Sequence, residues 1–107
     1  MQVIDNAIGG VRVRSTSPRT QPVFNPATGE QSAVLPLSTR AELDAAVAAA
    51  KLAAPAWGET PPLKRARFMF NFKQLLDANA KKIAEVISAE HGKTHADAVG
   101  EVQRGVE

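Results

Sequence analysis

An alanine-rich stretch between Ala41 and Ala56 limits the kind of core that this chain can build. Apolar residues make up 44% of the 107 residues, which suits a globular protein, but alanine buries little surface compared with leucine or phenylalanine. The larger apolar side chains gather in two segments, Leu63 to Leu76 and Ile83 to Ile87. We therefore expect a thin core that depends on those two segments, in a chain whose size leaves little margin of stability.

Composition argues against several classes of function. The formal net charge is only +2, which gives no support to nucleic-acid binding. The sequence contains no cysteine, so these residues hold no disulfide, no thiolate metal site and no thiol nucleophile. No apolar run approaches the roughly 20 residues that cross a bilayer, and the start of the chain lacks a hydrophobic signal core. We predict a soluble chain with neither a nucleic-acid nor a membrane partner.

Residues 1–37 have the pattern of short strands and turns. Arg12, Arg14 and Arg19, with the hydroxyl residues beside them, also suit an organellar transit peptide, but the apolar residues around Gly9-Gly10 favour a β-hairpin. Those apolar residues are Val3, Ile4, Val11 and Val13, of which the last two alternate with arginines as in a half-buried strand.

Two further local patterns follow before residue 39. Proline and glycine in 26–29 predict a turn, and residues 31–37 predict another extended segment.

Residues 39–107 have the pattern of about four α-helices. Thr39 and Glu42 form a capping box that predicts the start of the first helix, and Gly58 is a plausible stop. The apolar stripe of this helix is narrow and consists of Leu43, Ala46, Val47, Ala50, Ala54 and Trp57.

Pro61 and Pro62 predict the start of a second helix, because proline at the first helical positions removes no needed donor. We expect a break near Asn79 and then a third helix that ends at Gly92. The predicted buried face consists of Leu63, Met69, Phe72, Leu75 and Leu76, and Lys64, Arg65 and Arg67 lie on the other side.

Thr94 and Asp97 predict the start of a fourth helix, whose apolar positions are Ala98, Val102 and Val106. No glycine, asparagine or proline ends this helix before Glu107. We therefore expect the chain to be a truncated piece of a longer protein.

Two motifs near residue 92 partly match known binding sites. Gly92-Lys93-Thr94 matches the end of a phosphate loop, but Ile87 stands where that loop requires glycine. His91 and His95 are four residues apart, as in helical zinc sites, but Gly92 interrupts the helix between them and no third ligand is near. We predict no metal site, and the chain also lacks the Gly-x-Gly-x-x-Gly fingerprint of a dinucleotide site.

Arg104 is the one polar residue that we single out, because the neighbouring Gly105 allows a ligand or another backbone to approach closely. Spacing alone favours a different explanation, an i,i+3 ion pair with Glu101 on an exposed helix.

Three segments carry a family resemblance: VFNPATGE at 23–30, AAVAAAKLAAPAW at 45–57 and EHGKTHADAVGEVQRGVE at 90–107. In order and spacing they resemble the N-terminal region of aldehyde dehydrogenases. The last of them, together with PPLKRARFMFNFKQLL at 61–76, resembles the methylmalonate-semialdehyde dehydrogenase branch.

The resemblance implies an α/β enzyme in which residues 1–107 are the N-terminal part of the cofactor-binding domain. It implies oxidation of methylmalonate or malonate semialdehyde with NAD and coenzyme A to propionyl-CoA or acetyl-CoA, in valine catabolism, by a cytoplasmic homo-oligomer, expected to be a tetramer. The family's nucleophilic cysteine, oxyanion asparagine and nucleotide-binding strands come later in the chain. These residues would therefore hold no catalytic or cofactor-binding group and would be inactive alone.

One functional residue carries over from the family. Arg104 matches the arginine of the branch's GEV-x-RG motif, which makes it a candidate for binding the substrate's free carboxylate, and with this resemblance the ligand-binding explanation is favoured.

Two other functions remain open. The chain could be a stand-alone helical module that docks on a partner through Leu63 to Ile87. It could also belong to an aldehyde dehydrogenase of another substrate class.

Overall fold

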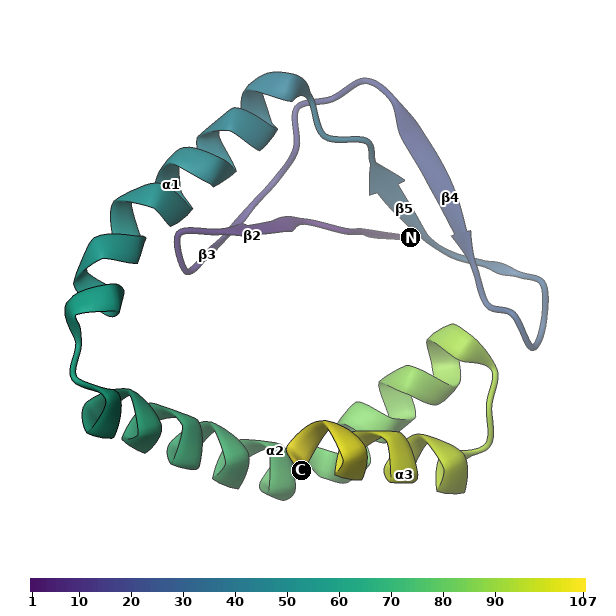
Figure 1. Ribbon diagram of the computed structural model, residues 1–107. Coiled ribbons are helices and arrows are strands. Elements are labelled where there is room, and N and C mark those ends of the chain that lie inside the picture. Colours follow the sequence, from purple (N-terminus) through teal and green to yellow (C-terminus); the bar gives the residue numbers. More distant parts are fainter. The chain divides into compact units, whose positions relative to one another are not determined.

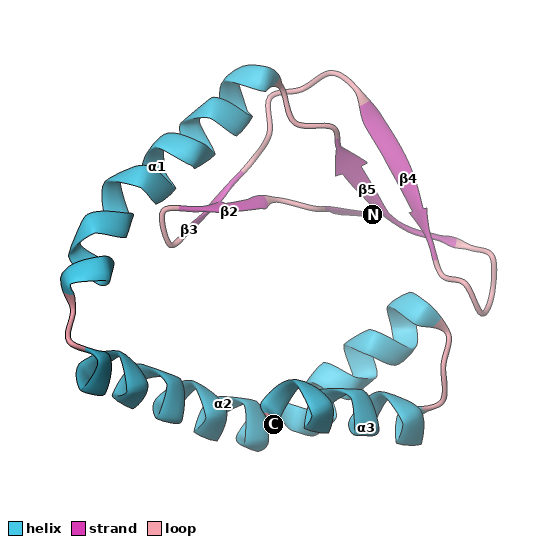
Figure 2. Ribbon diagram, viewed as in Figure 1, coloured by secondary structure: helices cyan, strands magenta, loops and turns pink.

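A computed structural model describes all of residues 1–107, as five short strands followed by three helices. The residues form two compact units (Figures 1 and 2). The first unit contains Met1–Phe24 and Gln31–Glu59, and the second contains Asn25–Glu30 and Thr60–Glu107. The prediction of strands followed by helices is confirmed, although there are three helices and not about four.

The first unit contains a three-stranded sheet with the order β1-β5-β4. β5 (Gln31–Pro36) is the central strand, with β1 (Gln2–Val3) parallel to it on one side and β4 (Thr20–Phe24) antiparallel on the other. Ala33 and Pro36 of β5 are the only buried residues of this unit. The predicted extended segment at 31–37 is confirmed as β5, which pairs with both other strands of the sheet.

The hairpin exists, but its predicted residues were partly wrong. It consists of β2 (Asn6–Ile8) and β3 (Val11–Val13), joined at Gly9 and Gly10, which both have positive φ (60° and 80°). A two-residue turn of this kind requires Ile8 to pair with Val11, which leaves Val3 outside the hairpin. Val3 pairs instead with Val34 of β5.

The predicted half-buried character of the 11–13 strand was also wrong. Val11 and Val13 are both exposed, as is Arg12 between them, because no element of the first unit covers either face of β3.

α1 (Arg40–Glu59) begins at the predicted capping box and continues one residue beyond Gly58. The Glu42 backbone N–H donates to Thr39 Oγ1 at 3.2 Å, and the Thr39 N–H donates to Glu42 Oε2 at 2.7 Å. Both bonds of the box are therefore present. None of the residues of α1 is buried, so its predicted apolar stripe has no complete partner among these residues.

A turn at 25–30 belongs to the second unit and follows the predicted proline and glycine signals. The Ala27 N–H donates to Asn25 Oδ1 at 2.9 Å, and Gly29 has a φ of 74°. Two backbone bonds, Gly29 N–H to Asn25 O and Asn25 N–H to Glu30 O, close the turn at 2.8 Å each.

α2 (Pro62–His91) is a single helix of 30 residues, so the predicted break near Asn79 was wrong. The Asn79 Nδ2 donates to the Leu75 carbonyl at 2.8 Å, one turn earlier, so its amide is satisfied within the helix. The flanking Ala78 and Ala80 favour helix, and the apolar spacing continues through Ile83. Gly92, in the left-handed conformation with φ 86°, ends the helix as predicted.

α3 (His95–Val106) returns beside α2 and supplies most of the core (Figure 1). Thr94 caps it, because Thr94 Oγ1 accepts from the Asp97 N–H at 3.3 Å. Ala98 and Val102 are buried against Ala84 of α2, with Ile83 and Ile87 packed around them. The whole chain buries only five residues, three of them alanine, so the predicted thin core is confirmed.

The predicted buried face of the N-terminal half of α2 was wrong for this chain. Leu63, Met69, Phe72 and Leu75 are all exposed, and only Leu76 is half-buried. α3 packs near Ala84, so nothing in the second unit covers the earlier turns.

Candidate functional site

Arg104 lies in the last turn of α3 with its side chain exposed. Val102, two residues earlier, is buried against α2. Because successive residues turn by about 100°, Arg104 projects from the side of α3 that faces away from α2. The guanidinium is therefore available to a ligand.

The predicted ion pair between Arg104 and Glu101 is not formed. Glu101 Oε1 instead lies 2.5 Å from Lys93 Nζ. Arg104 takes part in no ion pair and no side-chain hydrogen bond, and acts on Glu101 only as a nearby positive charge. A guanidinium without a carboxylate partner keeps its five donors for an anion.

Lys93 and Glu101 join the loop after α2 to the middle of α3. The Lys93 side chain is only 19% exposed, which is low for a lysine. The hydrogen bond from Lys93, with the positive charges of Lys93, Arg104 and His91, lowers the pKa of Glu101 below its ordinary value. The pair therefore engages the Glu101 carboxylate with Lys93 and not with Arg104.

The sequence does not reveal that Lys93 pairs with Glu101, and it suggests only a phosphate-loop role for this residue. Its partner is eight residues away, beyond the three- and four-residue spacings that reveal helical pairs. Ile87, which occupies the position of the required glycine, lies in α2 and packs against the core. Lys93 therefore pairs with a carboxylate of its own chain, Glu101, and is not part of a phosphate loop.

The two histidines belong to different helices. His91 is the last residue of α2 and His95 the first of α3, with the left-handed Gly92 between them. The structure brings no three potential metal-ligating side chains together. No helix of the chain is both long enough and apolar enough to span a membrane.

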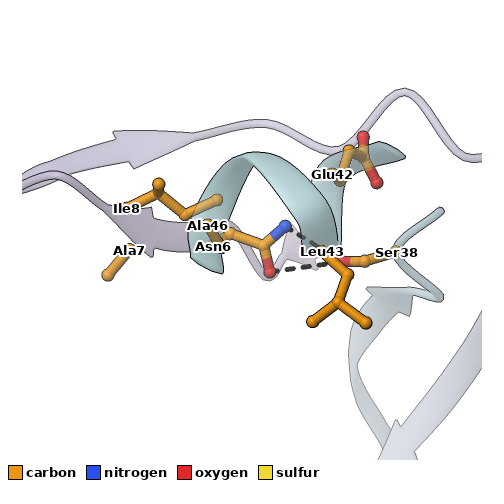
Figure 3. A pocket seen from close by; sticks show the side chains of 7 residues that line it. All are labelled: Asn6, Ala7, Ile8, Ser38, Glu42, Leu43 and Ala46. Carbon is orange, nitrogen blue, oxygen red and sulfur yellow. Dashed lines mark hydrogen bonds between the residues drawn. The ribbon is translucent and has the colours of Figure 1, made fainter. Parts of the chain in front are cut away.

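A hollow of about 220 Å³ lies in the first unit (Figure 3). Within it, Asn6 Nδ2 donates to Ser38 Oγ at 3.0 Å, and the Ser38 hydroxyl is placed to donate back to Asn6 Oδ1 at 3.4 Å. Its other lining residues are Ala7, Ile8, Glu42, Leu43 and Ala46. Glu42, the only charged one, points its carboxylate away from the Asn6–Ser38 pair in Figure 3, so the hollow offers no reactive group.

The Glu42 carboxylate is fully engaged elsewhere. Besides the Thr39 N–H, it accepts from the Thr16 N–H at 2.7 Å, from the Ser15 hydroxyl at 2.8 Å and from the Thr16 hydroxyl at 3.2 Å. The backbone bonds from Thr39 and Thr16, followed by the Ser15 bond, lower the pKa of Glu42 to about 2. Glu42 thus ties residues 15 and 16 to the start of α1 and is a structural carboxylate.

Comparison with known proteins identifies the family. Residues 13–107 match the aldehyde dehydrogenase family. Malonate-semialdehyde dehydrogenase 1 of Geobacillus thermodenitrificans is 48% identical over all 107 residues of the chain. The chain spans only 22% of the length of that relative.

Solved structures agree in fold. Methylmalonate-semialdehyde dehydrogenase from Oceanimonas doudoroffii superposes with a TM-score of 0.94 at 48% identity, over 99% of this chain and 22% of that one. A protein assigned as the same enzyme from Sinorhizobium meliloti, in complex with NAD, also gives a TM-score of 0.94, at 46% identity and the same coverage. The chain belongs to the aldehyde dehydrogenase family.

Proposed function

We propose that these 107 residues are the N-terminal part of the cofactor-binding domain of an NAD-dependent, CoA-acylating dehydrogenase of malonate or methylmalonate semialdehyde. The observation that carries the proposal is the 48% identity with malonate-semialdehyde dehydrogenase 1 over the whole chain. The NAD in the structure of the Sinorhizobium meliloti relative supports the choice of cofactor.

The reaction transfers the acyl group of the semialdehyde to coenzyme A. Hydride leaves the aldehyde carbon for NAD, and the thiol of coenzyme A takes the acyl group. Because acetyl has one carbon fewer than malonate semialdehyde, the free carboxylate must also leave as carbon dioxide. None of these steps has a nucleophile in this chain, which contains no cysteine, so residues 1–107 would be inactive alone.

The role proposed for Arg104 is to bind the free carboxylate of the semialdehyde. Its guanidinium is exposed and unpaired, and a planar guanidinium can hold a carboxylate by two parallel hydrogen bonds. Such a contact would orient the aldehyde and distinguish it from aldehydes that lack a carboxylate. We further propose that the complete enzyme is a cytoplasmic homotetramer of valine catabolism.

The test uses an exchange enzyme, in which residues 1–107 replace the matching segment of the Geobacillus thermodenitrificans enzyme. We expect it to form NADH from malonate semialdehyde, with a rate that depends on coenzyme A. The chain alone, at the same concentration, is the control and should form none.

Two outcomes would favour other functions. An exchange enzyme that oxidises propanal but not malonate semialdehyde would indicate another substrate class. A chain that folds as a stable monomer, together with an exchange enzyme that does not fold, would favour a stand-alone binding module. The exposed apolar residues of α2 would then form its binding surface.

A further inference from the structure

Glu101 has two cationic neighbours, and only one of them pairs with it. Lys93, in the loop between α2 and α3, places its Nζ 2.5 Å from Glu101 Oε1. Arg104, three residues further along α3, forms neither an ion pair nor a side-chain hydrogen bond with this carboxylate. All three residues belong to the second unit. The Glu101 carboxylate is therefore shared out in favour of the loop and not of its own helix.

Helix geometry favours the pair that is not formed. Side chains on an α-helix lean toward its N-terminus, so Arg104 extends back over the turn that contains Glu101. Opposite charges at this three-residue spacing ordinarily attract one another. After Lys93, Arg104 is the stronger of the two positive charges that lower the pKa of Glu101, ahead of His91. A Glu101 carboxylate without Lys93 would therefore have Arg104 as its main partner.

The surroundings of Lys93 explain why it wins this competition. Its side chain is only 19% exposed, whereas Arg104 lies in the exposed class. An ion pair with a lysine that is shielded from water is screened less than one with an exposed arginine. Lys93 is therefore the better partner for Glu101.

The same pair sets the local charge around Arg104. Lys93 and Arg104 each carry one positive charge and Glu101 carries one negative charge, so one positive charge is left uncompensated. Without Lys93, the charges of Glu101 and Arg104 would cancel, and the free carboxylate would repel any anion that approached Arg104. Loss of Lys93 would thus weaken anion binding both by occupying the guanidinium and by repulsion.

We propose that Lys93 is a positioning residue for the substrate, because by engaging Glu101 it keeps the Arg104 guanidinium free for the carboxylate of a semialdehyde. This proposal rests on the proposed function and adds a residue that sets selectivity without touching the substrate. Arg104 binds the substrate's carboxylate, and Lys93 withholds the competing carboxylate of the chain itself.

Steady-state kinetics of the exchange enzyme test the proposal. Lys93→Met should raise the KM for malonate semialdehyde about two- to tenfold, the range expected for a neighbouring charge at a partly exposed site, while kcat stays near its original value. Adding Glu101→Gln to Lys93→Met should return this KM to near its original value, because no competing carboxylate remains. Lys93→Arg, which keeps the charge, should retain the original KM. Propanal, which has no carboxylate, is the reference substrate in each case.

Lys73→Met is the matched control. It removes a lysine that pairs with Asp77 at 2.7 Å, and no arginine lies within four residues of Asp77. An equal rise in KM for Lys73→Met and Lys93→Met would overturn the proposal. So would a KM that stays high in the double variant, because Lys93 would then act by some route other than Glu101.

The NMR resonance of the Arg104 Nε–H tests the competition without activity. In the chain of residues 1–107, this resonance should move in Lys93→Met, when Glu101 pairs with Arg104, and return when Glu101→Gln is added. An unchanged resonance in Lys93→Met would contradict the proposal whatever the activity. An exchange enzyme that ignores malonate semialdehyde would instead refute the proposed function, and the resonance would still show whether Lys93 keeps Glu101 from Arg104.

Discussion

Lys93 Nζ lies 2.5 Å from Glu101 Oε1, and this ion pair leaves Arg104 without a carboxylate partner. On an isolated helix, Glu101 and Arg104 are three residues apart and would be expected to pair with each other. Lys93, in the loop after α2, pairs with Glu101 instead. The arginine that matches the family motif is thereby left available for a ligand.

Replacement of Glu101 tests whether Arg104 interacts mainly with Glu101 in α3 or with the carboxylate of a substrate. In the exchange enzyme, Glu101→Gln should leave the KM for malonate semialdehyde unchanged or lower it, because Glu101 competes with a bound carboxylate for the positive charge of Arg104. Steady-state kinetics with malonate semialdehyde and propanal measure the effect. A rise in KM for malonate semialdehyde alone would indicate that Glu101 positions Arg104.

The pKa of Glu42 predicts an acid-sensitive contact at the start of α1. Its folded-state pKa of about 2 is below the ordinary 4.5, so the contact stabilises the fold above about pH 4.5 and is lost as the pH falls from there toward 2. NMR titration of the Glu42 carboxyl in the chain should give a midpoint near 2, with Glu42→Gln to assign the signal. A midpoint at 4.5 would show that the bonds from Ser15 and Thr16 are not formed.

Gly92 should not tolerate a side chain. It has φ 86°, and a Cβ there would lie 3.3 Å from Pro26 Cγ. Gly92→Ala should cost about 1–2 kcal/mol, since an L-residue is strained in the left-handed conformation. Gly100→Ala is the control, because a Cβ at Gly100 meets nothing within 4 Å and should stabilise α3 by about 0.5–1 kcal/mol.

Hydrogen exchange of the α2 and α3 amides in the chain measures both glycine variants. The opening free energy should fall for Gly92→Ala and rise for Gly100→Ala. A rise for both variants would refute the left-handed conformation of Gly92.

Local signals in the sequence predicted the boundaries of elements well. Thr39, Thr94 and Gly92 begin or end helices as expected, because each acts through hydrogen bonds within a few residues of itself. The predicted break near Asn79 was wrong for a related reason. An asparagine side chain can bond one turn back, and this option competes with ending the helix.

Contacts between distant residues could not be predicted in the same way. The parallel pairing of Val3 with Val34 and the bond from Thr16 to Glu42 join segments about 30 residues apart, and no spacing rule reveals them. The apolar pattern of α2 predicted a buried face, but Leu63, Met69 and Phe72 are exposed. Periodicity shows which residues share a side of a helix, and it does not show whether another element covers that side.

The role of Arg104 is tested most directly by Arg104→Leu in the exchange enzyme, with malonate semialdehyde and propanal compared side by side. Loss of a charge-assisted contact worth roughly 1.5–3 kcal/mol should lower kcat/KM for malonate semialdehyde about 10- to 100-fold, while kcat/KM for propanal stays near its original value. Arg104→Lys should retain part of the preference for the carboxylate. An equal loss for the two aldehydes would contradict the proposal that Arg104 binds the substrate's carboxylate.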